Sequence, residues 1–364
     1  MFRAPNSAEG HGTSRSGPSG GRRKYVKSHR PVIHGGLART MGITANFAAL
    51  RLQMSQPLPN PFKNLSTQRV FITGGTGFIG TSLVKLLLDA GHNITILARN
   101  LRKAAAQFQA RVRFVQSLSD LTPDDAFDVI INLAGAPVLG PRWSQKRQAQ
   151  LLARRVGVTR ALTAWLATAQ HKPGVWVQAS AIGFYGVRNA DELLTETSAP
   201  GKGFMAELCG QWEQSAQDVE ACGVRKVVLR LGVVFGAGGA LPPLLLPHRF
   251  AMGGRMGSGQ QVISWIHLAD LMQIIGAAID NDAMQGIYNT VAPQAITQSE
   301  FSKTVGRLLN RPVWFHIPAK PVRWAAGEMA ELLLDGQHVQ PARLLSEQFN
   351  FSFPTLEKAL QDLV

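Results

Sequence analysis

The stretch Arg69–Arg99, RVFITGGTGFIGTSLVKLLLDAGHNITILAR, contains the pattern from which the architecture follows. Residues 70–73 are apolar and rich in β-forming side chains, as in a strand buried on both faces of a parallel sheet. Apolar residues recur at helical spacing over 83–90, and residues 93–97 form a second β-rich run. The stretch therefore predicts a strand, a turn, a helix and a second strand, which together make a βαβ unit.

Three glycines at regular spacing, Gly74, Gly77 and Gly80, connect the first strand to the helix. Glycine at these positions permits a tight turn, close backbone approach to a pyrophosphate and close packing of the helix on the strand. The free N–H groups and the macrodipole of a helix N-terminus favour an anion. The unit therefore predicts a dinucleotide-binding site, and the alternative is a glycine turn that holds no ligand.

The residue that follows the second strand indicates the type of dinucleotide. NAD-binding units usually carry Asp or Glu there to hold the ribose 2′-hydroxyl, whereas this chain has Arg99, followed by Arg102 and Lys103. A cation can pair with a 2′-phosphate, so NADP is favoured over NAD. The alternative is that Arg99 is only a solvated charge at the end of a strand.

Composition limits the class of protein. A chain of 364 residues with 45% hydrophobic and 17% charged residues fits a globular protein, built as one large α/β domain with an appended lobe or as two small domains. No apolar run reaches the roughly 18–20 residues of a membrane span. The two cysteines, Cys209 and Cys222, cannot make a disulfide framework or a metal cluster by themselves. We expect a reducing, cytoplasmic location, no bound metal and no membrane partner.

The net charge of +15 is concentrated at the N-terminus. Residues 1–66 contain ten Lys and Arg and one Glu, which accounts for +9 of the total. The remaining chain is only mildly basic, so nucleic acid is not an expected partner for it. We expect residues 1–66 to be disordered or loosely attached, because they lack sustained periodicity.

Three interpretations of this N-terminal segment stay open. It resembles an organelle transit peptide, which would indicate a mitochondrial location. It could be a nonspecific polyanion-binding arm. The natural start could also lie later, with Met54 as one candidate, and this interpretation is favoured because the segment lacks a clear amphipathic helix.

Downstream patterns predict further alternation of strands and helices. Further strands are expected at residues 112–116, 128–135, 175–180, 226–236 (with its turn), 286–291 and 312–317. Helices are expected at residues 102–110, 143–169, 204–222, 270–280 and 299–309. Thr297 and Glu300 form a capping signal for the last of these helices. This alternation predicts an α/β fold with a Rossmann-type doubly wound parallel sheet and a smaller C-terminal α/β lobe.

Several motifs carry a resemblance to a known superfamily. They are Thr73–Gly80 (T-G-x-x-G-x-x-G), Asn132–Gly135 (N-x-A-G), Ser180–Gly186, Arg230–Gly236 and Ile266–Asp270. Together they resemble the extended short-chain dehydrogenases/reductases. The pairs Arg142-Trp143 and Trp212-Glu213, and the segments 204–209, 254–259 and 264–267, resemble the "epimerase family protein" subgroup, whose members bind NADP. The resemblance covers about residues 69–364, including a C-terminal domain of unknown function.

The resemblance implies which residues contact the cofactor. These are Gly74, Gly75, Thr76, Gly77, Phe78, Ile79 and Gly80 at the pyrophosphate, Ala98 and Arg99 at the adenine ribose, Leu133 and Ala134 along the cleft, Arg155 on the long helix, and Val234 beside the nicotinamide. The expected domain division is a basic extension (1–66), a dinucleotide-binding domain (67–289) and a C-terminal lobe (290–364), with 236–263 contributing to the lobe.

The proton relay of the superfamily is missing. Counting back from Glu213 along the helix puts Cys209 where the superfamily has lysine and Met205 where it has tyrosine, and no tyrosine of the chain has a lysine four residues later. Ser180, with a one-residue ambiguity towards Ala181, and Tyr185 are the substitute catalytic candidates. Tyr185 could equally be a packing residue. His267 and Asp270 could be an acid/base pair, although such a pair more often fixes the lobe on the core.

The chain is therefore predicted to be an NADP(H)-binding oxidoreductase or epimerase acting on a small carbonyl or sugar-type substrate. It would act as a monomer or homodimer, with the substrate in the crevice at the carboxyl ends of the strands. One alternative is an NADP-binding protein with little or no catalysis that regulates a partner, for instance in cell division. A weaker alternative is a nucleic-acid-associated protein that uses the basic N-terminus.

Overall fold

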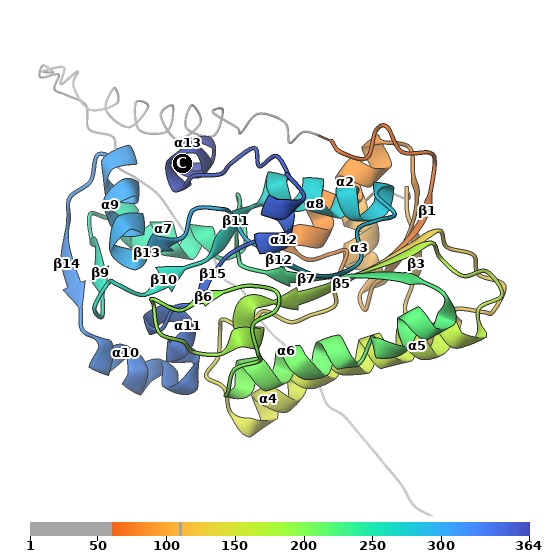
Figure 1. The fold of residues 1–364 in the computed structure, drawn as a ribbon, viewed down its shortest axis with the longest axis horizontal. Coiled ribbons are helices and arrows are strands. Elements are labelled where there is room, and N and C mark those ends of the chain that lie inside the picture. The colour runs from red at the N-terminus through yellow and green to blue at the C-terminus, as the bar shows by residue number, and fades with distance from the viewer. Residues whose placement is uncertain (1–59, 109–110) are drawn as a thin grey trace, which may run out of the picture. The chain divides into compact units, whose positions relative to one another are not determined.

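A seven-stranded parallel sheet forms the centre of the protein (Figure 1). The computed structural model describes residues 60–108 and 111–364. The strand order is β12–β7–β5–β4–β1–β2–β3, with bounds β1 Arg69–Thr73, β2 Asn93–Leu97, β3 Arg113–Val115, β4 Val129–Asn132, β5 Val175–Ala181, β7 Arg225–Leu231 and β12 Gly286–Thr290. The order reverses between β1 and β4, which confirms the predicted doubly wound topology.

Helices and short strands surround this sheet. The helices are α2 Phe78–Asp89, α3 Leu101–Phe108, α4 Gln145–Leu152, α5 Val158–Thr168, α6 Phe204–Gln214, α7 Leu241–Arg249, α8 Leu268–Asp280, α9 Gln298–Leu308, α10 Ala319–Ala326, α11 Glu331–Leu334, α12 Ala342–Ser346 and α13 Leu356–Leu363. The short strands are β6 Leu193–Leu194, β8 Val233–Phe235, β9 Gly253–Met256, β10 Val262–Ile263, β11 Trp265–His267, β13 Ile296–Thr297, β14 Val313–Ile317 and β15 His338–Val339.

The sheet is covered by helices on both faces. In the view of Figure 1, α2 and α8 lie above the sheet and α4, α5 and α6 lie below it. Val70 and Ile72 of β1 belong to the apolar cluster that includes α2 and α8. Phe71 lies between them in sequence and belongs to the opposite cluster, with Trp165 of α5. Since successive side chains of a strand face opposite sides, the continuous apolar run of β1 is explained by burial on both.

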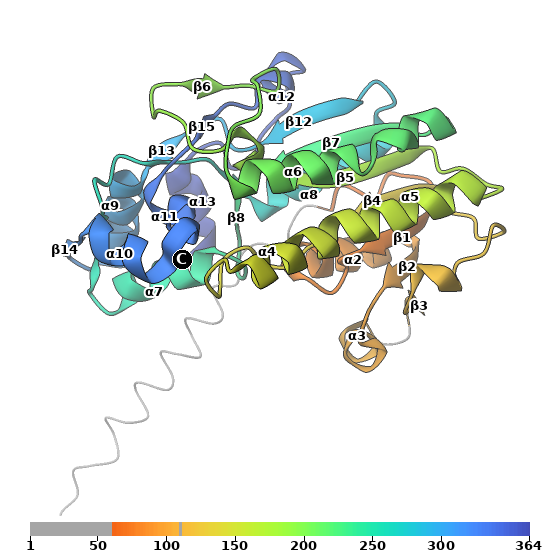
Figure 2. The ribbon, with the colours of Figure 1, turned by 90° about the horizontal axis from the view of Figure 1, so that it is seen from below.

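A smaller lobe lies beyond the carboxyl ends of the strands. Figure 2 shows α7, α9, α10, α11 and α13 grouped at one end of the sheet. Its core contains Phe235, Trp265 and Phe301, with side chains of α7, α9 and α13 packed around them. Strands β9 and β14 form a separate parallel pair at its edge. The capping box predicted at Thr297 and Glu300 is present at the start of α9.

Three predicted elements are interrupted in the structure. The helix expected at 204–222 ends at Gln214 and is followed by a separate 3₁₀ helix at Gln217–Cys222. The long helix expected at 143–169 is two helices, α4 and α5, joined by a π-helical turn at Ala153–Gly157. The segment 226–236, expected to be a strand and its turn, contains β7, which ends at Leu231, and β8, which lies outside the main sheet as the partner of β11. Gly232 makes the break, because a Cβ at this position would lie 2.6 Å from the carbonyl oxygen of Ser264.

The segment just before β1 is packed, which corrects one sequence expectation. Phe62 is fully buried in the cluster beneath α2 and α8. The Asn60 side chain donates to the carbonyl of Leu86, and the Phe62 carbonyl lies 3.1 Å from Nε2 of His92. Residues 60–66 are therefore not loosely attached. Residues 1–59 lie outside the described part of the chain.

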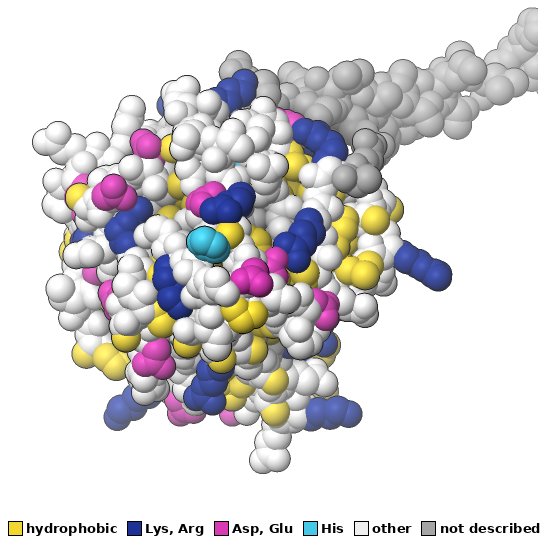
Figure 3. All heavy atoms as spheres, turned by 90° about the vertical axis from the view of Figure 1, so that its right-hand side faces the viewer, with side chains coloured by type: hydrophobic (Ala, Val, Ile, Leu, Met, Phe, Trp, Pro, Cys, Tyr) yellow, Lys and Arg dark blue, Asp and Glu magenta, His cyan; other side chains and the backbone are white. Residues whose placement is uncertain are grey.

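Charged side chains are mixed on the face shown in Figure 3. Lys and Arg alternate with Asp and Glu there, so this face of the described chain presents no continuous basic surface. Among the helices of residues 60–108 and 111–364, none has the length and apolar character needed to cross a membrane.

Truncation of Phe62 tests how firmly this segment is attached. Phe62→Ala should lower the free energy of unfolding by about 3 kcal/mol, since it empties a fully buried aromatic site. Urea unfolding measures the change. Phe250→Ala is the matched control, because Phe250 is 68% exposed and should cost less than about 1 kcal/mol. Equal effects of the two substitutions would show that residues 60–66 do not stabilise the fold.

Candidate functional site

The glycine turn forms a cradle that larger residues would fill. Gly74 has φ +71°, and a Cβ there would collide with the carbonyl of Leu133. A Cβ at Gly80 would collide with the carbonyl of Gly74. Gly77 begins α2 without any side-chain cap, and the first turn of α2 carries no acidic residue. The N-terminus of α2 therefore keeps its partial positive charge for an external anion, which fits a pyrophosphate.

The strand pairings bring the predicted dinucleotide contacts to one edge of the sheet. Thr73 is level with Leu97 of β2 on one side and with Asn132 of β4 on the other. Ala98–Arg99 and Leu133–Ala134 follow those strands, so both segments flank the glycine turn. Ala98 and Ala134 are buried, whereas Arg99 is exposed.

Within the turn itself, exposure varies from residue to residue. Gly75 is buried, Thr76 and Gly77 are exposed, and Phe78 and Ile79 are half-buried. The exposed residues stand at the tip of the turn, before the first turn of α2. The tip of the turn is therefore open to a ligand from the carboxyl edge of the sheet.

Arg155 is a buried cation without a carboxylate partner in the described chain. It is 9% exposed, donates to the carbonyl of Ala136 at 2.8 Å and lies over the ring of Trp212. Burial lowers its pKa below the usual value. The guanidinium also packs under Gly135, where a Cβ would approach it to 3.2 Å. Arg155 therefore supports the backbone that follows β4 and adds positive charge beside the cleft.

A cavity of about 440 Å³ lies between the ends of β5, β7 and β8 and the C-terminal lobe. Its sheet-side wall includes Phe78, Ala181 and Val234, and its lobe-side wall includes Leu244 and Phe301. Sites for small molecules usually measure about 300–1,000 Å³, so the cavity can hold a second ligand beside the dinucleotide cleft.

Of the two positions of the missing proton relay, one lines this cavity and the other is buried behind it, and neither carries a charge. Met205 lines it, and Cys209 lies directly behind, 1% exposed. A Cβ on Gly183 would lie 2.9 Å from Cε of Met205 and 3.5 Å from Sγ of Cys209. Burial raises the pKa of Cys209 to about 12, so the thiol stays protonated. Neither residue supplies the charge or the proton of a tyrosine–lysine pair.

Ser180 and Tyr185 are brought together by a buried ion pair. Arg230 is 2% exposed and makes a two-pronged contact with Glu213, at 2.9 Å and 2.8 Å. The Ser180 hydroxyl donates to Glu213 at 2.6 Å. Another nitrogen of Arg230 donates to the Tyr185 hydroxyl at 3.0 Å. Both hydroxyls thus belong to one buried network that lies outside the lining of the cavity.

The Tyr185 hydroxyl has no free position for a substrate. The side chain is fully buried, and its oxygen lies 2.7 Å from Oδ1 of Asn289 and 2.9 Å from the carbonyl of Thr195. Burial also raises its pKa above the usual value. These contacts favour the packing alternative for Tyr185. Neither Ser180 nor Tyr185 lines the cavity, whereas Ala181 does.

His267 and Asp270 are not paired with each other. Nδ1 of His267 accepts from the backbone N–H of Ala269 and caps α8. The carboxylate of Asp270 accepts from the backbone N–H groups of Ser352 and Phe353, at 2.7 Å and 3.0 Å. These contacts favour the structural alternative, in which both residues fix the lobe on the core.

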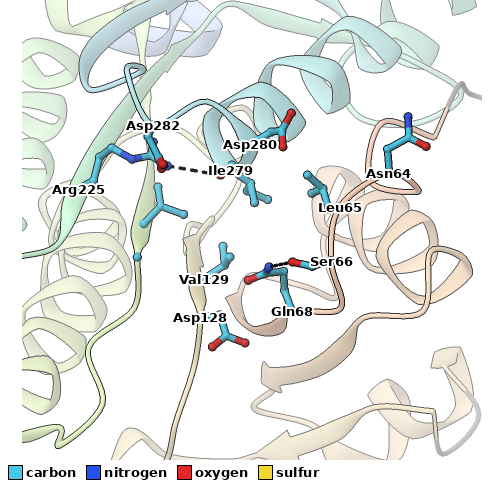
Figure 4. Close-up of a pocket in the computed structure, with 12 residues that line it drawn as sticks. Asn64, Leu65, Ser66, Gln68, Asp128, Val129, Arg225, Ile279, Asp280 and Asp282 are labelled. Carbon is cyan, nitrogen blue, oxygen red and sulfur yellow. Dashed lines mark hydrogen bonds and ion pairs between the residues drawn. The ribbon is translucent and has the colours of Figure 1, made fainter.

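A second, polar depression of about 270 Å³ lies at the opposite, amino-terminal ends of the strands (Figure 4). Asp128 and Asp282 line it, but each is already paired with an arginine, Arg69 and Arg225 respectively. In a parallel sheet the two ends are far apart, so this depression is separate from the glycine turn.

Sequence patterns missed two residues of the main cavity, His248 and Gln261. His248 is a single histidine in helix α7, which is apolar before it, and this contrast was the available signal. Gln261 lies in a loop before β10 and has no such signal.

Comparisons with known proteins agree with the geometry. The model of the "NAD dependent epimerase/dehydratase family" matches residues 70–290, and a domain of unknown function, DUF1731, matches residues 317–363. "Epimerase family protein YfhF" of Bacillus subtilis is 37% identical over 300 residues, which are 81% of this chain and 97% of that protein. The mouse "Epimerase family protein SDR39U1" is 35% identical over 300 residues, 81% of this chain and 99% of that protein.

A solved structure has a similar fold over most of this chain. It is that of the human epimerase family protein SDR39U1 (isoform 2) with NADPH, and it has a TM-score of 0.73 and 34% sequence identity. The match covers 81% of this chain and 98% of the human chain.

The pKa shifts of His267 and Asp270 can be tested by measuring the free energy of unfolding as a function of pH. Burial lowers the pKa of His267 from 6.5 to about 4, so the unfolded chain binds more protons between these values and stability rises with pH. Burial raises the pKa of Asp270 from 3.8 to about 6, so the folded chain binds more protons there and stability falls with pH. In the wild type the two effects largely cancel.

Single substitutions should separate the effect of His267 on stability from that of Asp270. In Asp270→Asn, the free energy of unfolding should rise with pH more than in the wild type, by about 3 kcal/mol between about pH 4 and 6, because the opposing effect of Asp270 is removed. In His267→Asn, which keeps a capping acceptor, it should fall by about 3 kcal/mol between about pH 4 and 6. Denaturant unfolding across this pH range measures both. Parallel curves for the two variants would contradict the assignment.

Proposed function

The chain belongs to the NAD dependent epimerase/dehydratase family, and on this basis we propose that it is an NADP(H)-binding oxidoreductase for a small molecule. The observation that carries the proposal is the glycine cradle at the uncapped N-terminus of α2, which opens beside a cavity able to hold a second ligand. The dinucleotide would lie across the ends of β1, β2 and β4, with its pyrophosphate on the cradle.

Arg99 supports NADP over NAD. Its guanidinium is exposed and has no carboxylate partner among the described residues. Arg102 and Lys103, on the first turn of α3, are also exposed. A 2′-phosphate beside Arg99 would provide the anion that this group of cations lacks. The human relative that was solved with NADPH supports the same choice.

A bound NADP(H) supplies or accepts a hydride, and reduction of a carbonyl also needs one proton for its oxygen. Met205 lines this cavity at the position of the superfamily's tyrosine, so the standard proton donor is absent. A catalytic role for Ser180 and Tyr185 stays a prediction. Their contacts favour a positioning role, in which the Glu213–Arg230 pair holds the end of β5 rigid against the cavity.

Binding of NADP(H) without turnover is a second candidate function. The observation that favours it is the same absence of a proton donor from Met205 and Cys209. In that case dinucleotide binding would be retained while no carbonyl substrate is reduced.

Charge reversal at Arg99 tests the cofactor assignment. Arg99→Asp should weaken NADPH binding by about tenfold to a hundredfold, because a charge-assisted contact to the 2′-phosphate is lost, and should leave NADH binding nearly unchanged. Titration followed by NADPH fluorescence measures both. Arg160→Asp is the matched control, since Arg160 is exposed on α5. An unchanged ratio of NADPH to NADH affinity in Arg99→Asp would contradict the assignment.

Removal of one hydroxyl separates positioning from catalysis. Tyr185→Phe should lower the free energy of unfolding by about 1–3 kcal/mol, because Arg230 and Asn289 lose a buried partner, while NADPH affinity stays unchanged. Tyr288→Phe is the control, as it removes a buried tyrosine hydroxyl bonded to Glu347 and Arg343 instead.

NADPH oxidation by the Tyr185→Phe variant would then be compared with wild type on a panel of carbonyl compounds. Loss of turnover with unchanged stability would identify Tyr185 as the proton donor. No turnover by the wild type on a wide panel would favour binding alone.

A further inference from the structure

We propose that the outer end of the C-terminal lobe docks on the surface of a membrane that contains anionic lipids. Four exposed apolar side chains, which we call the lobe patch, would make the contact: Phe250, Met252, Trp314 and Phe315. The inference goes beyond the proposed function and does not depend on it. The sequence predicts no membrane partner because no apolar run is long enough to span a bilayer, but a surface contact needs no such run.

Contacts between β14 and the loop after α7 bring the lobe patch together. The indole N–H of Trp314 donates to the carbonyl of Ala251 at 3.1 Å, and Ala251 stands between Phe250 and Met252 in the chain. The rings of Trp314 and Phe315 are 5.2 Å apart. Strand β9, which follows this loop, pairs with β14. The four side chains are therefore neighbours, although they come from two distant segments.

The lobe patch is open to an approaching flat surface. Trp314 is 71% exposed and Phe250 is 68% exposed. Figures 1 and 2 both show β14 at the outer end of the lobe. Tryptophan and phenylalanine are favoured at the membrane–water interface because their rings leave water there. The N–H of Trp314 keeps its bond to Ala251, so the ring can enter the interface without leaving a polar group unpaired.

The two segments that carry the lobe patch contain cations but no acid. Residues 241–269 and 301–327 include no Asp or Glu. Their cations are Arg249, Arg255, Lys303, Arg307, Arg311, Lys320 and Arg323. Anionic lipid headgroups attract Lys and Arg near the surface, so this composition matches an anionic membrane.

Two of these cations flank the lobe patch and have no acidic partner among the described residues. Arg249 directly precedes Phe250, Arg311 lies just before β14, and both are exposed. Arg307 and Arg323, by contrast, are paired with acids outside the two segments. The free cations also disfavour a second copy of this chain as the partner, because like charges would then face each other.

Continuity with the main cavity favours a membrane over nucleic acid or an acidic protein. Met252 belongs both to the lobe patch and to the lining of the cavity, and Pro247 of α7 and Ile317 of β14 line the cavity as well. The exposed apolar surface thus continues into a wall that is also apolar. Nucleic acid can stack on aromatic rings, but it needs cations along its path. A membrane matches a continuous apolar surface that is flanked by cations.

Quenching by brominated lipid tests the position of Trp314. The full chain is mixed with vesicles of phosphatidylcholine and phosphatidylglycerol, with or without bromine on the acyl chains. We expect the brominated vesicles to quench tryptophan fluorescence, and Trp314→Phe to remove most of this quenching. Trp324→Phe is the matched control and should keep the quenching, because Trp324 is exposed on α10 outside the lobe patch. Brominated vesicles of phosphatidylcholine alone should quench little, because they lack the anionic charge.

Charge removal tests the role of the free cations. Arg249→Gln combined with Arg311→Gln should weaken vesicle binding about 25-fold, since each cation near an anionic surface contributes roughly fivefold. Sedimentation of the full chain with the same vesicles measures the affinity. Arg160→Gln is the control and should bind like the wild type, because Arg160 is exposed on α5, outside the lobe.

Three results would overturn the inference. Residues 1–66 carry most of the net charge and could adsorb to anionic vesicles by themselves, which would give binding without quenching at Trp314 and without loss in the double variant. The second result is no binding to either kind of vesicle, or equal quenching by vesicles that lack anionic lipid. The third is loss of single-stranded DNA binding in the double variant while vesicle binding is unchanged, since the lobe patch would then serve nucleic acid.

Discussion

The close backbone contact of Gly80 with Gly74, and of Gly74 with Leu133, is the constraint on which the site depends. No side chain fits at either glycine, so the first turn of α2 lies directly against the ends of β1 and β4. This contact leaves the uncapped N-terminus of α2 at the switch point of the strand order. The same contact therefore determines where helix and sheet meet and where an anion can bind.

The buried ion pair of Arg230 and Glu213 explains why two plausible catalytic hydroxyls stand outside the cavity. A buried charge has to be paired and fully hydrogen-bonded, and Ser180 and Tyr185 complete the shell of this pair. The wall of the cavity is left mainly apolar. The protein thus has, next to the polar glycine turn, a cavity whose lining is mainly apolar.

Sequence was sufficient where the signal is local or periodic. The strands of the main sheet, the glycine turn and the capping box at Thr297 follow from patterns within a few residues. It was insufficient where distant residues decide the structure. Phe62 is anchored by α2 and α8, the strand break at Gly232 depends on Ser264, and the side of β5 that Ser180 faces is fixed by Glu213. These contacts join residues that are far apart in the sequence, so the residues next to each position do not predict them.

The central claim is that this chain is built to hold NADP(H) at the α2 cradle. The most direct measurement is native mass spectrometry of the full chain after incubation with equal amounts of NADPH and NADH, followed by removal of free nucleotide. The account predicts one NADPH per chain and little NADH. A chain that retains neither dinucleotide, or retains NADH in preference, would contradict it.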